Sequence, residues 1–287
     1  MKSGKPLNRS ALRSHPLPSV VAGGKETKGR ILILAGSRDV PGAALLAATA
    51  AMRAGAGKLK IVTVGSVAPH IATAMPEAMV VGLPEQRGGG FAPSAAEMIA
   101  READDADAIV AGPGMAPGKI CKQIGEILLN SSAGLAMDAA LLRSLSPTAN
   151  VERASPPLLL PHAGELASLL ECQEQAITAD PVGCGLRCAE LYRSIVLVKG
   201  VVSHVVHPDG RAWTYRGGAP GLGVSGSGDV LAGIVGGLLA RGAGPLVALL
   251  WGVWLHGEAG AALAKKIGPI GFLAREIAAE VPALLPP

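Results

Sequence analysis

Apolar residues recur along this chain in two alternating patterns: short uninterrupted runs and longer helical stretches. Runs rich in Ile, Leu and Val occupy Arg30–Gly36 and Lys58–Val64, and an Ala-rich stretch that ends in glycine, Pro41–Gly57, separates them. Uninterrupted runs of this length are typical of strands buried on both faces, and glycine commonly ends a helix. The order strand, helix, strand therefore predicts a βαβ unit with two parallel strands.

The same alternation continues through the middle of the chain. Further strands are predicted over 78–84, Asp107–Gly114, 134–139, Pro156–Glu165 (a strand with a loop) and 194–200, and further helices over Ser94–Glu102, Lys119–Asn130 and Pro181–Tyr192. A hairpin is predicted over 202–215, with its turn at Pro208–Gly210, and the last third of the chain is predicted to be mostly helical. This order of elements predicts an α/β fold in which helices cover both faces of a mainly parallel sheet.

Residues 1–27 lack this periodicity. They are rich in Pro, Ser, Lys and Arg, which predicts a flexible N-terminal arm. Residues 28–287 contain neither a linker-like break nor a repeat, which predicts a single domain.

The distribution of apolar residues also bears on location. The first thirty residues have no apolar segment of the kind found in signal peptides. The most apolar runs, 230–240 and 246–255, are each too short to cross a bilayer. We therefore expect a cytoplasmic protein that does not associate with membranes.

Composition makes a nucleic-acid partner unexpected. Only 2% of the residues are aromatic, and the formal net charge is +4. Proteins that bind single-stranded nucleic acid stack bases on aromatic side chains, and nucleic-acid-binding proteins carry a concentrated basic surface.

Loops rich in glycine or polar residues follow the predicted strands. They span 36–42, 112–118, 138–141, 161–165, 199–203 and 220–229. In open α/β sheets, ligands bind at the carboxyl ends of the strands. These loops therefore predict a ligand site along one edge of the sheet.

The last of these loops has the highest density of glycine. Its letters match GxGxxG, but the dinucleotide fingerprint belongs after the first strand of a βαβ unit, whereas this copy follows a hairpin. The glycines lead into an apolar helix, so a phosphate could approach free backbone N–H groups at the positive end of the helix dipole. The alternative is a structural loop capped by Asp229. A carboxylate beside a phosphate site has a chemical role if it accepts a proton from the attacking hydroxyl, which makes Asp229 a candidate catalytic base.

Several motifs, taken in order, resemble the ATP/ADP-dependent NAD(P)H-hydrate dehydratase family of the ribokinase-like superfamily. They are GRILILAGSRDVPGAALLAATAAMRAGAG (Gly29–Gly57), AGPGM (Ala111–Met115), LLLPHAGELASLL (Leu158–Leu170), VLVKG (Val196–Gly200) and GSGDVLAGIVGGLLARG (Gly226–Gly242). The resemblance runs from about Gly29 to the C-terminus, and it implies a ribokinase-like three-layer fold. The chain departs from the family pattern at Ala140, where the family usually has a second acid, and at Ala219, where it has Asn.

The resemblance implies a metabolite-repair reaction. The (S)-hydrate of NADH or NADPH would be dehydrated to NAD(P)H, coupled to hydrolysis of ADP to AMP, or of ATP, with Mg²⁺. Asp229 would deprotonate the ring hydroxyl, and the backbone of Gly226–Gly228 would stabilise the transferred phosphoryl group. The implied substrate-binding residues are Ala43, Gly114, His162 and Asp229, and the implied nucleotide-binding residues are Lys199, Gly200, Val201, Val202, Ser203, Gly226, Ser227 and Gly228.

Other side chains carry two interpretations each. His162 either contacts the ligand or is a loop histidine satisfied by its neighbours, and Lys199 either contacts a phosphate or faces solvent. Glu165 either caps the helix that follows it or binds Mg²⁺ through water. Asp138 either fixes its loop or holds a metal-bound water.

Two further functions are compatible with the same motifs. One is a small-alcohol kinase of the same superfamily, acting on a thiazole or pyrimidine vitamin precursor, which would share the glycines and the catalytic acid. The other is a protein that binds a nucleotide without turnover. The expected partners are NAD(P)H hydrate and an adenine nucleotide, and the Ala- and Gly-rich helices are compatible with a homo-oligomer, either a dimer or a tetramer.

Overall fold

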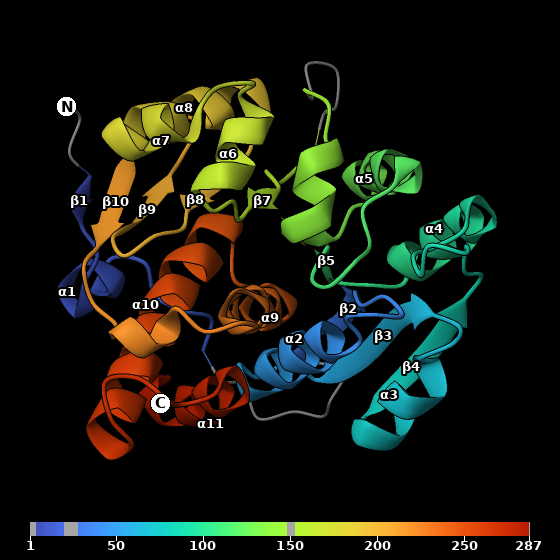
Figure 1. Ribbon diagram of the computed structural model, residues 1–287. Coiled ribbons are helices and arrows are strands. Elements are labelled where there is room, and N and C mark those ends of the chain that lie inside the picture. The colour runs from blue at the N-terminus through green and yellow to red at the C-terminus, as the bar shows by residue number, and fades with distance from the viewer. Residues whose placement is uncertain (1–3, 20–27, 148–152, 287) are drawn as a thin grey trace.

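The computed structural model describes residues 4–19, 28–147 and 153–286, which form a sheet between two layers of helices (Figure 1). The strands are β1 (Lys5–Pro6), β2 (Arg30–Leu34), β3 (Lys58–Val64), β4 (Ala78–Leu83), β5 (Ala108–Ala111), β6 (Gly134–Met137), β7 (Leu158–Leu159), β8 (Ile195–Val198), β9 (Ser203–Val206) and β10 (Ala212–Tyr215). Their spatial order is β1-β10-β9-β8-β7-β6-β5-β2-β3-β4.

The sheet is mainly parallel, as its apolar strands predict. The neighbours from β4 across to β8 all pair in parallel, and Ile33 of β2 lies between Ile61 of β3 and Val110 of β5. The predicted hairpin is confirmed, because β9 runs antiparallel to both β8 and β10. Side chains of the central strands are buried on both faces, which explains why these strands appear in the sequence as uninterrupted apolar runs.

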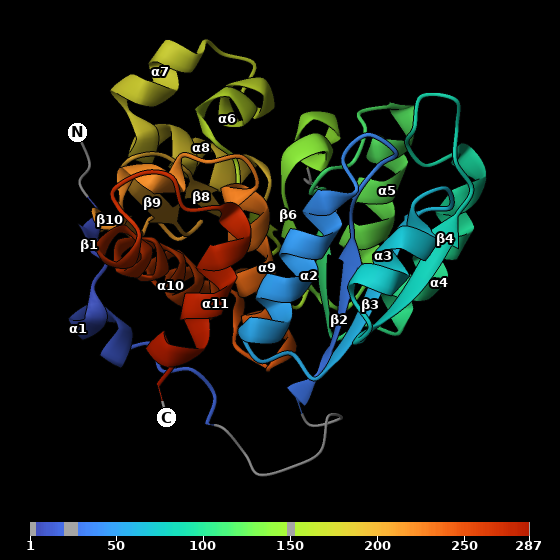
Figure 2. The ribbon, with the colours of Figure 1, turned by 60° about the horizontal axis from the view of Figure 1, so that its bottom comes forward.

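Helices cover both faces of this sheet. One layer contains α2 (Gly42–Arg53), α3 (Ala68–Ala74), α9 (Ser227–Ala240), α10 (Pro245–Lys266) and α11 (Ala274–Leu284) (Figures 1 and 2). The other contains α4 (Ala96–Asp104), α5 (Lys119–Asn130), α6 (Ala163–Leu169), α7 (Glu174–Ala179) and α8 (Pro181–Leu191). Short 3₁₀ turns, η2 (Pro93–Ala95), η3 (Ala139–Ser144) and η4 (Pro220–Leu222), complete the order. This arrangement confirms the expected three-layer α/β fold.

The N-terminal segment differs from the expected flexible arm. Lys5 of β1 pairs in parallel with Trp213 of β10, and the short helix α1 (Arg9–Arg13) follows. Leu7 and Leu12 are buried, and the indole of Trp251 donates a hydrogen bond of 2.7 Å to the carbonyl oxygen of His15. Backbone pairing and buried leucines therefore hold residues 4–19 against the sheet, whereas 1–3 and 20–27 lie outside the described residues.

Helix α10 is long and apolar enough to cross a membrane by length and composition alone. In the structure, 67% of its most apolar window is buried inside the fold. Val253 and Leu255 of this helix lie in the core. Its apolar surface is therefore used mostly in packing against the other helices and the sheet.

Glycines allow α9 to lie unusually close to α2 and to the sheet. A Cβ atom at Gly233 would overlap the carbonyl oxygen of Ala47, and one at Gly237 would overlap that of Ala51. A Cβ atom at Gly236 would meet the side chain of Val110 in β5. This close packing positions the start of α9 at the carboxyl edge of the sheet, beside α2.

Replacing Gly233 with Ala tests this packing. Alanine favours a helix over glycine by about 1 kcal/mol, but overpacking costs typically about 1–3 kcal/mol and occasionally more, so the variant should be less stable than the wild type. We expect a lower denaturant midpoint for Gly233→Ala in urea unfolding. Gly42→Ala is the matched control, because Gly42 is also helical and, among the described residues, no atom outside its chain neighbours and its own helix backbone would lie within 4 Å of the new Cβ. Equal midpoints for the two variants would contradict the close approach of α9.

Candidate active site

The predicted loops gather at the carboxyl ends of the parallel strands, as expected for this fold. Asp138 follows β6 directly, Lys199 follows β8, and the loop that ends at His162 follows β7. Helix α9 brings its first turn, which contains Asp229, to the same region. Residues from four separate elements therefore meet at one edge of the sheet.

Lys199 links the acidic side chains of this region. Its Nζ atom lies 2.6 Å from Oδ1 of Asp138 and 3.8 Å from Oε2 of Glu165. The three side chains are largely buried, with 19%, 4% and 7% of their side-chain surfaces exposed for lysine, aspartate and glutamate respectively. The alternative in which Lys199 simply faces solvent is therefore wrong.

The backbone around Asp138 requires a specific local geometry. Its Oδ1 also accepts a hydrogen bond of 2.8 Å from the backbone N–H of Ala139, so Asp138 caps η3. Gly112 follows β5 with a φ of +116°, and a Cβ atom there would overlap the carbonyl oxygen of Asp138. Gly112, the first of the two glycines in AGPGM, is therefore needed for the main chain of Asp138 to lie where it does.

His162 and Glu165 form a capping box at the start of α6. The Nδ1 atom of His162 accepts hydrogen bonds from the backbone of Gly164 and Glu165, at 3.1 and 3.4 Å. In return, Oε2 of Glu165 accepts one of 2.9 Å from the backbone N–H of His162. Glu165 thus acts as the cap that one interpretation proposed. His162 is satisfied through Nδ1, while half of its side chain, 51%, remains exposed.

Asp229 is half-buried in the first turn of α9. Burial raises its pKa from 3.8 to about 7, and the nearby negative charge of Asp138 adds to the rise, while the ammonium group of Lys199 opposes it. A carboxyl group with this pKa changes protonation near neutral pH. It is therefore suited to accept and release a proton there.

The turn before α9 leaves backbone donors available. Gly226 is the N-cap, with a φ of +87°, and within the described part of the chain no side chain makes a capping hydrogen bond there, so the alternative in which Asp229 serves as the cap is wrong. A Cβ atom at Gly228 would lie 3.7 Å from Nζ of Lys199 and 3.9 Å from Oδ2 of Asp138. The positive end of α9 therefore lies beside Lys199 and Asp138.

Ala43 and Gly114 lie against each other at the same edge. A Cβ atom at Gly114, whose φ is +62°, would overlap the methyl group of Ala43 and the carbonyl oxygen of Val40. One turn further along α2, Leu46 lies against Gly226. The structure therefore brings together the implied substrate-binding pair and the glycine-rich turn, while contact with a ligand stays a prediction.

The implied nucleotide loop extends outward from Lys199. The hydroxyl group of Ser203 donates a hydrogen bond of 3.3 Å to the carbonyl oxygen of Gly200. Val201 is 98% exposed, which is unusual for a large apolar side chain, and Val202 lies between it and β9. Contact of this loop with a nucleotide stays a prediction as well.

His256 was missed by the sequence analysis. It lies in α10, and its Nε2 atom is 3.0 Å from the hydroxyl oxygen of Ser227 in the first turn of α9. The only sequence signal is a single imidazole within the apolar stretch WGVWLHG. An imidazole in such a helix gives no indication of which other helix it contacts.

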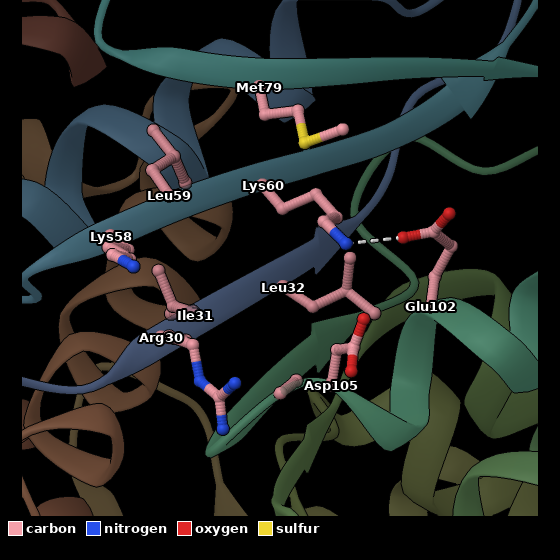
Figure 3. Close-up of a pocket in the computed structure, with 10 residues that line it drawn as sticks. Arg30, Ile31, Leu32, Lys58, Leu59, Lys60, Met79, Glu102 and Asp105 are labelled. Atoms are coloured by element: carbon pink, nitrogen blue, oxygen red, sulfur yellow. Dashed lines mark hydrogen bonds and ion pairs between the residues drawn. The ribbon is translucent and has the colours of Figure 1, made fainter. Parts of the chain in front are cut away.

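A hollow of about 230 Å³ lies at the opposite edge of the sheet (Figure 3). Its walls include Arg30 and Lys58, which are the first residues of β2 and β3. The hollow therefore lies at the amino ends of the strands, whereas the predicted site lies at their carboxyl ends. Lys60 pairs there with Glu102 at 2.6 Å (Figure 3). None of the predicted site residues, all of which the structure describes, lines this hollow.

Comparison with known proteins agrees with this geometry. A family model described as NAD(P)H-hydrate dehydratase matches residues 31–283. The chain is 47% identical to the ADP-dependent (S)-NAD(P)H-hydrate dehydratase of Xanthomonas campestris pv. campestris, over 97% of this chain and 95% of that protein. It is 32% identical to a bifunctional NAD(P)H-hydrate repair enzyme of Moorella thermoacetica, over 92% of this chain but only about half, 50%, of that protein's length.

Solved structures give the same result. The ADP/ATP-dependent NAD(P)H-hydrate dehydratase of Bacillus subtilis, co-crystallised with ATP and Mg²⁺, superposes with a TM-score of 0.85 and 27% identity, over 99% of this chain and 98% of that one. Arabidopsis thaliana ribokinase superposes with a TM-score of 0.53 and 12% identity, over 87% and 98% of the two chains, a likeness that shows the fold alone. The chain therefore belongs to the NAD(P)H-hydrate dehydratase family, within a ribokinase-like fold.

Proposed function

We propose that this protein dehydrates the (S)-hydrate of NADH or NADPH, coupled to hydrolysis of ADP to AMP and phosphate. The observation that carries the proposal is a carboxyl group with a pKa of about 7, Asp229, in the uncapped first turn of α9. The 47% identity to an ADP-dependent dehydratase supports the choice of reaction and of nucleotide.

The chemistry assigned to Asp229 is proton transfer. Its carboxylate takes the proton of the ring hydroxyl, and the hydroxyl oxygen attacks the terminal phosphorus of ADP while the bond to AMP breaks. The backbone N–H groups of Gly226 and Gly228 and the dipole of α9 stabilise the negative charge on the transferred group, whereas the N–H group of Ser227 already donates to the carbonyl oxygen of Val224. The ring C–O bond then breaks with its electron pair on the departing phosphate, and loss of a proton from the adjacent carbon restores the double bond.

The side chains of the site fit Mg²⁺ in a water-mediated form. Among the residues that the structure describes, no three His, Cys, Asp or Glu side chains come together as a metal-binding group. Asp138 and Glu165 supply hard oxygen atoms, but both already lie near Lys199. Proteins commonly hold Mg²⁺ through one or two carboxylates together with water and substrate phosphates. Bound there, the ion would neutralise the charge of the nucleotide.

The charge of the site also supports a cation. Asp138, Glu165 and Asp229 are three acids, whereas the cationic side chain paired with them is Lys199, and the imidazole of His162 lies 3.5 Å from Glu165. An anionic nucleotide would be repelled by the acids unless additional positive charge accompanied it. This balance supports the proposal that ADP binds together with Mg²⁺.

The direct test of this function is restoration of the reduced cofactor. Purified protein is mixed with NADH hydrate, Mg²⁺ and either ADP or ATP, and the absorbance of reduced nicotinamide is followed. We expect recovery that requires a nucleotide and Mg²⁺ and that is faster with ADP. Accumulation of a phosphorylated small alcohol without such recovery would favour the kinase alternative, and nucleotide binding without any turnover would favour a sensor.

A homo-oligomer stays a prediction, which light scattering would test.

Asp229→Asn separates catalysis from binding. The variant lacks the base but keeps the backbone N–H groups of α9, so we expect kcat to fall by about 10²–10⁴-fold. Because a negative charge is lost beside the phosphates, affinity for ADP with Mg²⁺ should be kept or increased in calorimetry. Near-normal turnover by this variant would exclude Asp229 as the base.

The same variant tests the pKa of Asp229. Between pH 3.8 and about 7 the folded protein binds this proton more tightly than the unfolded chain, so the group lowers stability as pH rises through that range. Asparagine removes this effect, and its gain in Tm over the wild type should be larger at pH 8 than at pH 5. The same gain at both pH values would show that the pKa of Asp229 is ordinary.

The pKa of Asp229 should also appear in the pH profile of turnover. In the wild type, kcat should fall as the pH drops below about 7, because the base is then protonated.

Gly228→Ala tests whether a phosphate lies against the first turn of α9. A Cβ atom at Gly228 would be at ordinary contact distance from Lys199 and Asp138, so the free protein should fold with unchanged or slightly higher Tm. We expect ADP affinity to fall by about tenfold, or about 1.4 kcal/mol, which is comparable with the loss of one hydrogen bond to a charged group.

Gly226→Ala is the contrasting variant. A Cβ atom at Gly226 would overlap the side chain of Leu46, and the φ of +87° is strained for alanine, so Gly226→Ala should lower Tm.

The outcome that would contradict a phosphate site at this turn is a Gly228→Ala variant that keeps full affinity for ADP.

A further inference from the structure

An imidazole from α10 contacts the first turn of α9. Nε2 of His256 lies 3.0 Å from the hydroxyl oxygen of Ser227 and 3.1 Å from the carbonyl oxygen of the same residue. Ser227 itself is buried, 5% exposed, between Gly226 and Gly228. His256 therefore contacts the main chain and the side chain of one residue of the glycine-rich turn.

The contact with the carbonyl oxygen favours one tautomer of His256. A carbonyl oxygen can only accept, so we assign the hydrogen to Nε2, which lies 3.1 Å from that oxygen. The single N–H is then shared between the two oxygen atoms of Ser227. Because Ser227 Oγ accepts from this N–H, its own hydroxyl hydrogen is free to be donated to another acceptor.

The environment keeps His256 neutral. Burial lowers its pKa from 6.5 to about 4, and although the hydrogen bond with Ser227 opposes this, the positive charge of Lys199 adds to the lowering. The imidazole is therefore uncharged at physiological pH, and its Nδ1 atom carries no hydrogen. The Nε2–H donor to Ser227 is present over the whole range in which Asp229 titrates.

Among the described residues, the side chains from other elements that lie against Gly226 at the first turn of α9, Leu46 and Ala274, are apolar and offer no hydrogen bond. The N-cap of α9 is Gly226, whose missing side chain makes no capping hydrogen bond, and Gly223, Gly226 and Gly228 allow the turn many conformations. A turn of this composition needs an external contact to keep its N–H groups aligned. His256 supplies one at Ser227, between the two glycines nearest to Asp229.

We propose that His256 is a positioning residue, which fixes Ser227 so that its hydroxyl group donates to the phosphoryl group transferred over the first turn of α9. The inference deepens the proposed function and rests on it for the identity of the ligand. It assigns to His256 no contact with substrate and no proton transfer. The imidazole acts through Ser227 alone.

A double-mutant cycle tests this assignment. The variants are His256→Leu, Ser227→Ala and the pair combined, with His256→Gln as the conservative variant because its amide can supply an N–H donor. The control is His70→Gln, an exposed residue of α3. Four quantities are measured for each protein: kcat, the KM for ADP, Tm and the affinity for ADP with Mg²⁺. The affinity is measured by calorimetry without turnover.

We expect Ser227→Ala to lower kcat by about 10²–10³-fold, as loss of a direct donor does, and His256→Leu by about 10- to 100-fold, because the hydroxyl group is then misplaced rather than removed. The double variant should be no slower than the slower single variant, because both changes remove the same donor. His256→Gln should recover most of the activity. Additive losses, or a His256→Leu variant with normal kcat and a lowered Tm alone, would overturn the proposal.

Two further results keep the test decisive. If His256→Leu does not fold, the comparison of His256→Gln with Ser227→Ala takes its place, and a Gln variant as slow as the Ala variant counts against the proposal. In ¹⁵N NMR of the wild type, His256 should show a hydrogen on Nε2 and no titration above pH 5. A hydrogen on Nδ1 would overturn the assignment, even if the protein had no dehydratase activity.

Discussion

The close approach of α9 to α2 and to the sheet is the constraint on which the site depends. Gly233, Gly236 and Gly237 leave no room for side chains at this contact. The helix therefore lies deep in its layer, and its first turn reaches the carboxyl edge of the parallel strands. If the helix were lifted by the width of a methyl group, the free N–H groups and Asp229 would move away from Lys199 and Asp138 together.

At that edge, each buried charged group changes the charge or the pKa of its neighbours. Lys199 neutralises part of the charge of Asp138 and Glu165, and Asp138 in turn contributes to the high pKa of Asp229. Burying several charges is costly unless they are paired and hydrogen-bonded. Here Oδ1 of Asp138 and Oε2 of Glu165, the oxygens nearest Lys199, each also accept a hydrogen bond from a backbone N–H group. Ala140, which stands where the family usually has a second acid, is itself buried, so no charge is buried at this position.

Much of the fold could be predicted from the sequence, because strands buried on both faces produce continuous apolar runs. The order of strands and helices and the hairpin followed from that pattern. The segment β1–α1 could not be predicted, because its two-residue strand is exposed and depends on pairing with β10, far along the chain. The loops of the site were also predictable from their positions after strands. The pairing of Lys199 with Asp138, and the contact of His256 with Ser227, depend on side chains that only the tertiary fold brings together.

The pKa of about 7 at Asp229 has a consequence for binding as well as for catalysis. A group that is partly protonated at neutral pH responds to small changes in the local potential. A phosphate arriving at the first turn of α9 would make Asp229 take up a proton, and a divalent cation arriving with it would favour release of that proton. The net number of protons exchanged on binding, which appears as a dependence of the binding enthalpy on the buffer, would therefore record the balance between the two charges.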